Sequence, residues 1–302
     1  MITQPTTLPF HLVDVFAVEP LTGNPLAVVE GGTNLSLDVL RRIAREFNQS
    51  ETTFLLPPTR SEADWRLRSF TAAGAEVFGA GHNALGAWSW LAHAKRLNLT
   101  GSTTLFHQEI GDRVLPVTIL QTAGSSPANV VMEQESPRFD RRLENVASLA
   151  DALGLTTADV AVDRAPCQVV FTGAPHLMVP IRNREAVDRI HPKSQALRAL
   201  LEAVGGEGCF VFSLDPLQPG ATAYARFFNP TVGIWEDPAT GTAAGPLGAH
   251  LLANGLVKQG ETIVIEQGTA MGRTSLIQVE VLADAVKIVG RSVVVADGLL
   301  FL

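Results

Sequence analysis

An internal repeat constrains the fold of this chain more than any other feature of its sequence. Residues 23–29 read G-N-P-L-A-V-V, and residues 173–179 read G-A-P-H-L-M-V. Each is followed, in the same order, by a helical segment, a short strand-like run, an Arg-x-Phe sequence and a Leu-Gly-Ala sequence. These pairs lie at residues 37–47 and 197–204, 53–56 and 209–212, 68–70 and 226–228, and 85–87 and 247–249. Five features in one shared order predict two similar halves rather than one irregular α/β domain with coincidental G-x-P turns.

The length of the chain agrees with two domains. At 302 residues a single hydrophobic core no longer grows, and chains divide. The stretch around 122–129 is small, polar and rich in breakers, so we predict an N-terminal lobe at 1–125 and a C-terminal lobe at 126–302. The last strand-like run, within 292–302, fits either lobe, the N-terminal one included.

Two helices differ from the rest in pattern. Residues 84–97 and 243–254 carry apolar or small side chains on nearly every face, which is typical of a helix wrapped by other elements. Alternating runs such as 13–16 and 276–281 predict half-buried strands around them. We therefore expect an α+β fold of two pseudo-symmetric lobes, each a curved mixed β-sheet wrapped around a central helix.

Composition excludes several classes of protein. Hydrophobic residues make up 46% and charged residues 18%, as in a globular protein, and a net charge of −7 argues against nucleic-acid or anionic-membrane partners. No run of 18 apolar residues predicts a membrane span, and residues 1–9 lack the pattern of a secretion signal. Cys167 and Cys209 have no CxxC partner, so we expect reduced, buried thiols in a cytoplasmic protein.

Cofactor and metal motifs are also missing or incomplete. Residues 79–84 fit G-x-G-x-x-A, but 71–75 do not form an apolar strand before it and 97–104 contain no carboxylate. The seven histidines form no HxxxH or HxH pair, and there is no G-x-S-x-G elbow. We therefore expect no cofactor, no metal and no serine nucleophile.

Glycine-rich turns precede both central helices, at 79–82 and 241–245. The start of a helix presents unpaired N–H groups and a partial positive charge, which together attract anions. Glycine in either turn can also serve only to make the turn tight. Because the two turns recur at equivalent places, we favour a site for a substrate carboxylate or a developing oxyanion.

Three ionisable residues stand beside these turns or before a strand. Glu51 precedes an apolar run, His82 ends the first glycine-rich turn, and Asp237 leads into the second. Each has an ordinary alternative: a solvated turn acid, a capping residue and a helix-capping carboxylate, respectively.

Motifs around these residues make the chain similar to the phenazine-biosynthesis PhzF-like family. They are D-V-F at 14–16, G-N-P-L-A-V at 23–28, S-E-T-T-F at 50–54, G-H at 81–82 and E-D-P-A-T-G-T-A at 236–243. The resemblance covers nearly the whole chain. It implies a diaminopimelate epimerase-like fold and a cofactor-independent isomerase of a biosynthetic process. It also implies a homodimer that binds a small carboxylated substrate, cyclic or not.

The resemblance also assigns roles. It implies that Glu51 is the general acid/base and that His82 and Asp237 complete the catalytic set. Residues expected to contact substrate are Gly81, Asn83, Gly241, Thr242 and Ala243. Related two-base epimerases carry a cysteine where this chain has Ala80 and Thr240, so thiol-based racemisation is not expected. Residues 71–78 depart from the family pattern, which leaves the identity of the substrate open.

The implied mechanism transfers a proton from and to carbon. Enclosure between two lobes would raise the pKa of Glu51 by desolvation, so that it acts first as base and then as acid. Protonated His82, Thr242 and the helix N-termini would stabilise developing negative charge. Asp237 would bind a substrate amine or hydroxyl, or hold His82 in one tautomer.

Alternatives to this mechanism remain. An epimerase or racemase of an amino-acid-like substrate would pair Glu51 with His82 or Asp237, and a catalytically silent protein would keep only the binding site. Glu207, three residues before Phe210 as Glu51 is before Phe54, is a pseudo-equivalent carboxylate that we expect in an exposed turn.

Overall fold

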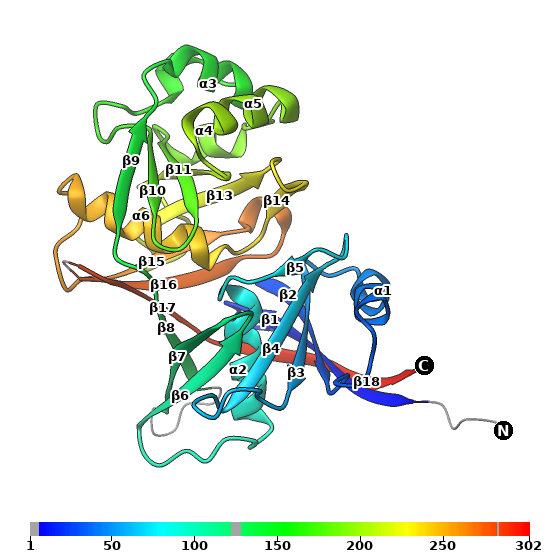
Figure 1. Cartoon of the computed structure of the whole chain (residues 1–302). Helices are drawn as coiled ribbons and strands as arrows, with labels where there is room; N and C mark the ends of the chain where they lie inside the picture. Colours follow the sequence, from blue (N-terminus) through cyan, green and yellow to red (C-terminus); the bar gives the residue numbers. More distant parts are fainter. Residues whose placement is uncertain (1–5, 122–127, 283) are drawn as a thin grey trace. The chain divides into compact units, whose positions relative to one another are not determined.

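The computed structural model describes residues 6–121, 128–282 and 284–302, which fold into two compact units (Figure 1). The first unit runs to Met132 and also includes Gly290–Leu302, and the second is Glu133–Val289. The predicted boundary at 125/126 lies outside the described residues. The chain instead leaves the first unit near the end of strand β8 (Asn129–Glu133) and returns at the end of β17 (Val286–Gly290).

The first unit is one mixed sheet with two helices. Its strands follow the order β18-β1-β2-β3-β4-β6-β7-β8, with the short β5 paired to β4. The pairs β2–β3 and β4–β6 are parallel and the others antiparallel. Its other elements are β1 (Thr7–Val15), β2 (Asn24–Glu30), α1 (Leu37–Phe47), β3 (Glu51–Leu56), β4 (Trp65–Thr71), β5 (Glu76–Val77), α2 (His82–His93), β6 (Thr103–Ile110), β7 (Arg113–Leu120) and β18 (Ser292–Phe301).

The second unit repeats this topology. Its order is β9-β10-β11-β12-β13-β15-β16-β17, with the short β14 on β13, and its parallel pairs are β11–β12 and β13–β15. Strand for strand, this matches the first unit, so the repeat predicted from sequence is a repeat of the whole sheet. Its strands are β9 (Arg138–Arg142), β10 (Gln168–Phe171), β11 (Pro175–Pro180), β12 (Gly208–Ser213), β13 (Ala223–Asn229), β14 (Ile234–Asp237), β15 (Thr262–Gln267) and β16 (Ser275–Val281). Its helices are α3 (Val146–Leu153), α4 (Arg184–Asp188), α5 (Ser194–Val204), α6 (Gly241–Ala253) and the 3-10 turns Thr157–Asp159 and Thr269–Met271.

A buried helix lies against the sheet of each unit, α2 in the first and α6 in the second. Ten of the twelve residues of α2 are buried, as its all-round apolar pattern predicts. The repeated Leu-Gly-Ala has a packing cause: a Cβ at Gly86 would lie 2.6 Å from Leu26 Cδ2, and one at Gly248 would lie 2.9 Å from Val279 Cγ1. Glycine therefore lets each helix approach its sheet closely. The predicted α+β architecture, a mixed sheet around a central helix in each unit, is confirmed.

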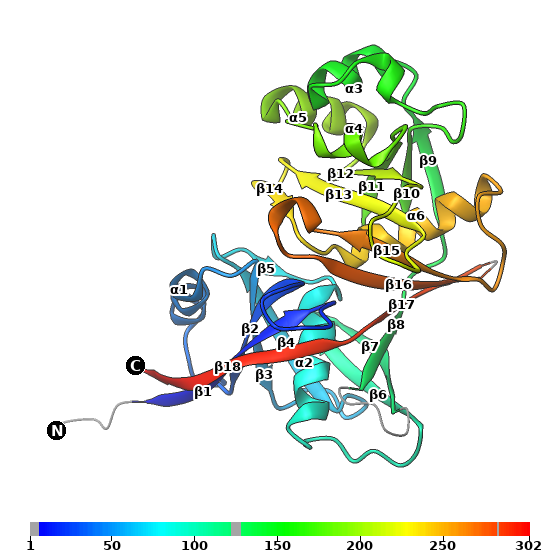
Figure 2. The same ribbon diagram turned by 180° about the vertical axis from the view of Figure 1, so that it is seen from behind.

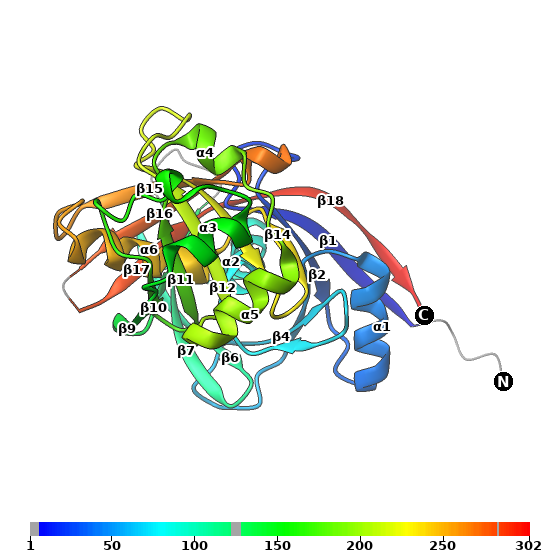
Figure 3. The ribbon, with the colours of Figure 1, turned by 90° about the horizontal axis from the view of Figure 1, so that it is seen from above.

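Shorter amphipathic helices cover the outer sides of the sheets. In the first unit Leu40 and Ile43 of α1 join Phe54 and Phe70 in one apolar cluster. In the second unit α3, α4 and α5 lie together on one side of the sheet, where their apolar side chains pack against β10, β11 and β12 (Figures 1 and 3).

The last strand belongs to the first unit. β18 pairs antiparallel with β1 along its whole length, from Val15 opposite Ser292 to Thr7 opposite Phe301 (Figure 2). Residues 290–302 therefore leave the predicted C-terminal lobe and complete the sheet of the N-terminal one. None of the helices in the described part of the chain has the length and hydropathy that crossing a membrane requires.

Candidate active site

The first unit brings Glu51 and His82 together. Glu51 begins β3, just after the α1 C-cap Asn48 turns the backbone with a φ of 50°, and His82 begins α2. Glu51 Oε2 lies 3.8 Å from His82 Nδ1, and the two side chains are only 16% and 10% exposed. The S-E-T-T-F and G-H motifs, thirty residues apart, thus meet at one end of the buried helix.

His82 is neutral at physiological pH in this environment. Burial lowers its pKa to about 4, and the nearby carboxylate does not reverse that effect. Its Nε2 is buried and has no hydrogen-bond partner among the described residues. The prediction of a protonated His82 is therefore wrong for the ligand-free protein, and the imidazole can act through a hydrogen bond rather than a full charge.

The side chain of Asn83 builds the turn that precedes α2. Its Oδ1 accepts the N–H of Gly81 at 2.8 Å, and its Nδ2 donates to Gly79 O and to Ser69 Oγ, each at 3.0 Å. Only 1% of Asn83 is exposed. The side-chain amide of Asn83 and the N–H of Gly81 are therefore hydrogen-bonded within the protein, and substrate contacts of Gly81 and Asn83 stay predictions. The N-cap residue of α2 is glycine, so no side chain caps this helix from that position.

An ion pair fixes the strand leading into that turn. Arg68 on β4 donates from Nε and from one terminal nitrogen to the two oxygens of Glu76 on β5, at 2.7 and 2.9 Å. The guanidinium also lies over the ring of Phe70, 5.2 Å from its centroid. A planar bidentate pair of this kind restrains direction as well as distance.

The second unit contains the same pair. Arg226 on β13 donates to both oxygens of Glu236 on β14 at 2.8 Å, and lies over Phe228 at 4.9 Å. Glu236 directly precedes Asp237, so this pair also restrains the entry to a central helix. Sequence reasoning missed both pairs, although their signal is present: an Arg-x-Phe repeat with a glutamate eight or ten residues after each arginine.

Asp237 ends β14 in a buried hydrogen-bond network. The hydroxyl of Thr240 donates to Asp237 Oδ2 at 2.5 Å, and Gln267 contacts the backbone of both residues. Asp237 and Thr240 are each 8% exposed, and Gln267 is fully buried.

The predicted contacts at the start of α6 divide into two groups. Thr242 is half-buried in the first turn, and Gly241 precedes it with its C=O accepting from Gln134 Nε2 at 3.0 Å. Ala243 is fully buried, and its N–H donates a hydrogen bond to Thr240 O at 3.1 Å. The predicted substrate contact of Ala243 stays a prediction, and its N–H is already hydrogen-bonded within the protein. Glu51 and His82 belong to the first unit, and the remaining predicted residues from Asp237 onward belong to the second.

The registers correct the position equivalent to Glu51. Leu26 pairs with Glu51, and the matching residue of the repeat, His176, pairs with Gly208 rather than Glu207. A Cβ at Gly208 would lie 2.4 Å from Phe227 Cζ, so an aromatic ring fills the place where the first unit has its carboxylate. Glu207 is exposed, as predicted.

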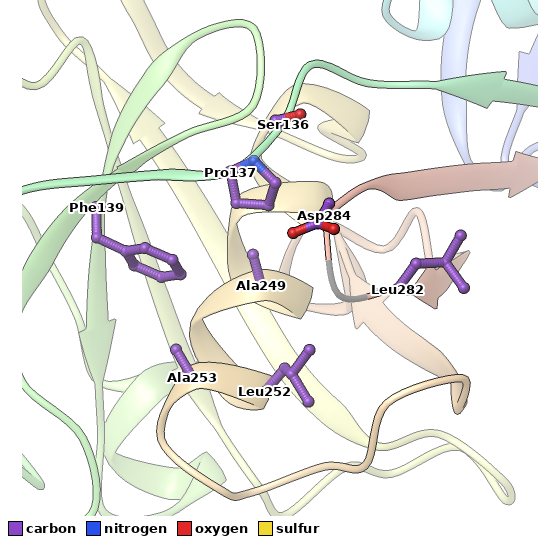
Figure 4. Close-up of a pocket in the computed structure, with 8 residues that line it drawn as sticks. All are labelled: Ser136, Pro137, Phe139, Ala249, Leu252, Ala253, Leu282 and Asp284. Atoms are coloured by element: carbon purple, nitrogen blue, oxygen red, sulfur yellow. The ribbon is translucent and has the colours of Figure 1, made fainter.

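The second unit also has a surface hollow of about 420 Å³, lined by the C-terminal half of α6 and by Ser136, Pro137, Phe139, Leu282 and Asp284 (Figure 4). None of the predicted site residues lines it. In the described residues no cluster of three or more His, Cys, Asp or Glu is arranged to hold a metal ion. Cys167 and Cys209 are buried free thiols, as predicted, and burial raises the pKa of Cys167 to about 12.

A family model described as phenazine biosynthesis-like protein, PhzC-PhzF, matches residues 13–298. The chain belongs to this PhzC-PhzF family. The uncharacterized isomerase YddE of Escherichia coli is 35% identical over 89% of this chain and 88% of its own length. The trans-2,3-dihydro-3-hydroxyanthranilate isomerase of Pseudomonas fluorescens is 33% identical over 88% of each chain. This PhzC-PhzF protein is accordingly an isomerase.

Solved structures agree with the PhzC-PhzF fold. A PhzF-family protein of Bacillus anthracis superposes with a TM-score of 0.89 at 25% identity, covering 98% of this chain and all of the other. A hydroxyproline epimerase of Agrobacterium vitis has a TM-score of 0.67 at 14% identity, covering 99% and 93%. The second likeness concerns the fold alone.

Proposed function

We propose that this isomerase moves a proton on a small carboxylated substrate without a cofactor, with Glu51 as the general acid/base. The observation that carries the proposal is the meeting of Glu51 with His82, 3.8 Å apart and nearly buried, at the first residue of a central helix. A carboxylate that is mostly withdrawn from water gains strength as a base, because its charged form is less well solvated.

The proposal assigns one group to each part of such a step. Glu51 takes a proton from carbon, the carboxylic acid so formed exchanges its proton with solvent, and it then returns a proton to another carbon, so that no proton is gained or lost overall. The electron pair left behind delocalises into the conjugated system or carboxylate. Neutral His82 can donate one hydrogen bond to that charge, and the first-turn N–H groups of α2 add partial positive charge without reorganising. Asp237 binds a substrate amine or hydroxyl.

The name of the Pseudomonas relative suggests the first compound to assay. Trans-2,3-dihydro-3-hydroxyanthranilate carries a carboxylate, an amine and a hydroxyl on one unsaturated ring, and these groups suit helix N-termini and Asp237. Residues 71–78 differ from the family pattern, so ring-substituted analogues belong in the same assay.

One observation disfavours an epimerase that takes an equivalent carboxylate from each unit, although it does not bear on a pairing of Glu51 with His82 or Asp237. The repeat does not supply a second carboxylate at the place of Glu51, because Gly208 stands there and Phe227 fills the space. A one-base shift therefore fits the described residues better than symmetric epimerisation does. The chirality of the product separates the two reactions.

The test is proton exchange in heavy water. Wild-type protein and the Glu51→Gln variant are incubated with the dihydro-hydroxyanthranilate and its analogues in D₂O, and deuterium in the product is measured by NMR. We expect incorporation by the wild type and a loss of at least about 10²-fold in Glu51→Gln, with binding of anthranilate retained. Glu207→Gln, the exposed carboxylate beside the equivalent position, is the matched control. Undiminished exchange in Glu51→Gln would remove this residue from the mechanism.

A further inference from the structure

Buried contacts restrain the backbone of the segment from Asp237 to Thr240, which leads into α6. Ser275 Oγ donates to Pro238 O at 2.9 Å. Gly268 packs on the same carbonyl with a φ of +78°, and a Cβ there would lie 2.5 Å from Pro238 O. Ser275 and the neighbouring Gln267 are both fully buried. The backbone beneath Asp237 is therefore rigid, and only side-chain rotation can change where its carboxylate points.

Gln267 sets the direction of the hydrogen bonds around that carboxylate. Its Oε1 accepts the N–H of Thr240 at 3.1 Å, and its Nε2 donates to Asp237 O at 2.7 Å. A backbone N–H can only donate and a backbone C=O can only accept, so these two partners determine which amide atom is which. The amide of Gln267 therefore has one orientation.

That orientation determines where the Thr240 proton goes. Gln267 Nε2 also donates to Thr240 Oγ1 at 3.1 Å, which uses a lone pair of the hydroxyl. The single hydroxyl proton then points to Asp237 Oδ2, 2.5 Å away. The bond from the Thr240 hydroxyl fixes the rotation of the Asp237 carboxyl group about its last torsion.

We propose that Thr240 and Gln267 are positioning residues that hold the Asp237 carboxylate in one orientation toward the substrate. This inference rests on the proposed function, in which the Asp237 carboxylate binds an amine or hydroxyl of the substrate. Thr240 and Gln267 act through Asp237 and need no contact with substrate themselves.

The test compares three single variants. Thr240→Val removes the hydroxyl at nearly constant shape, and Thr240→Ser restores a hydroxyl. Thr269→Val is the matched control, because Thr269 donates to Glu266 Oε1 at 2.7 Å, which is also a carboxylate three residues earlier in the chain. Crystal structures report the orientation of Asp237, and deuterium exchange with the dihydro-hydroxyanthranilate probe reports kcat and KM.

We expect the Asp237 carboxylate to rotate in Thr240→Val and kcat/KM to fall about tenfold or more, since misplaced catalytic groups cost this much. Thr240→Ser should keep the wild-type orientation and activity, and Thr269→Val should do the same. An unmoved carboxylate in Thr240→Val would overturn the proposal, as would equal losses in Thr240→Val and Thr269→Val. If wild-type protein exchanges nothing, the proposed function fails, whereas the crystallographic comparison still decides whether Thr240 positions Asp237.

Discussion

The two units share a strand order, two parallel pairs and a bidentate Arg–Glu pair before the central helix, yet they carry different polar groups. The first has Glu51 beside His82. At the position that corresponds to Glu51 the second has Gly208, and the ring of Phe227 occupies the space next to it. The second has Asp237 with Thr240 and Gln267, whereas the corresponding turn of the first unit is built by the amide of Asn83. The comparison teaches that the repeat preserved the scaffold around each central helix and changed the polar side chains beside it.

The Arg–Glu pairs give the largest expected difference between the units. Arg226 and Glu236 are 9% and 8% exposed, whereas Arg68 and Glu76 are about twice as exposed, at 22% and 19%. We expect Glu236→Gln to lower the free energy of unfolding by about 3 kcal/mol, because it leaves a buried guanidinium without its counter-charge. The matched Glu76→Gln should cost about 1 kcal/mol. Urea unfolding measures both free-energy changes. Equal changes would mean that the two ion pairs are buried to the same extent in solution.

Buried histidines give the next largest effect. Burial lowers the pKa of His176 to about 3, and both of its ring nitrogens lack hydrogen-bond partners within the described residues. Because the folded-state pKa lies below the unfolded value, the unfolded chain binds more protons between these two values. Stability is therefore complete above about pH 6.5 and falls as the pH drops toward 3, by about 1.4 kcal/mol per pH unit for this histidine.

The variant His176→Leu isolates this contribution. Between pH 6.5 and 5 its free energy of unfolding should fall by about 2 kcal/mol less than that of the wild type, since the neutral side chain has no proton to bind. His82, with a pKa of about 4, adds a similar slope in the first unit and remains in the variant. Replacing the exposed His93 by asparagine is the control. An unchanged slope in His176→Leu would show that this imidazole is hydrated.

Much of the fold was predictable because the repeat and the all-apolar helices are local patterns with direct physical causes. The shared order of G-x-P, Arg-x-Phe and Leu-Gly-Ala predicted two similar sheets, and glycines such as Gly86 proved to be close-packing positions. The placement of residues 292–302 was not predictable, because pairing with β1 depends on an edge that only the folded sheet exposes.

The proximity of two candidate site residues was predictable, but the states of these residues were less so. The meeting of Glu51 with His82 follows from two motifs, whereas the neutrality of His82 depends on how completely the chain buries it. Asn83 and Ala243 sit at the right turns, yet their polar groups are used internally, which only hydrogen-bond geometry reveals. The off-by-one match of Glu207 shows the same limit: counting from Phe210 ignores the register of the parallel pair, which places Gly208 opposite His176.

The smallest expected change in stability concerns Gly208, the position in the second unit that corresponds to Glu51. It tests this difference between the units directly. Gly208→Ala adds one methyl group where Phe227 and His176 already stand, so we expect a loss of about 1.5 kcal/mol in the free energy of unfolding from overpacking. Gly101→Ala, where an added Cβ meets no atom within 4 Å, should be neutral. Adding Phe227→Leu to Gly208→Ala should recover part of the loss, because the shorter side chain vacates the space at the ring edge. If Gly208→Ala is as stable as the wild type, the second unit has room at this position, and the structural objection to a second acid/base there falls away.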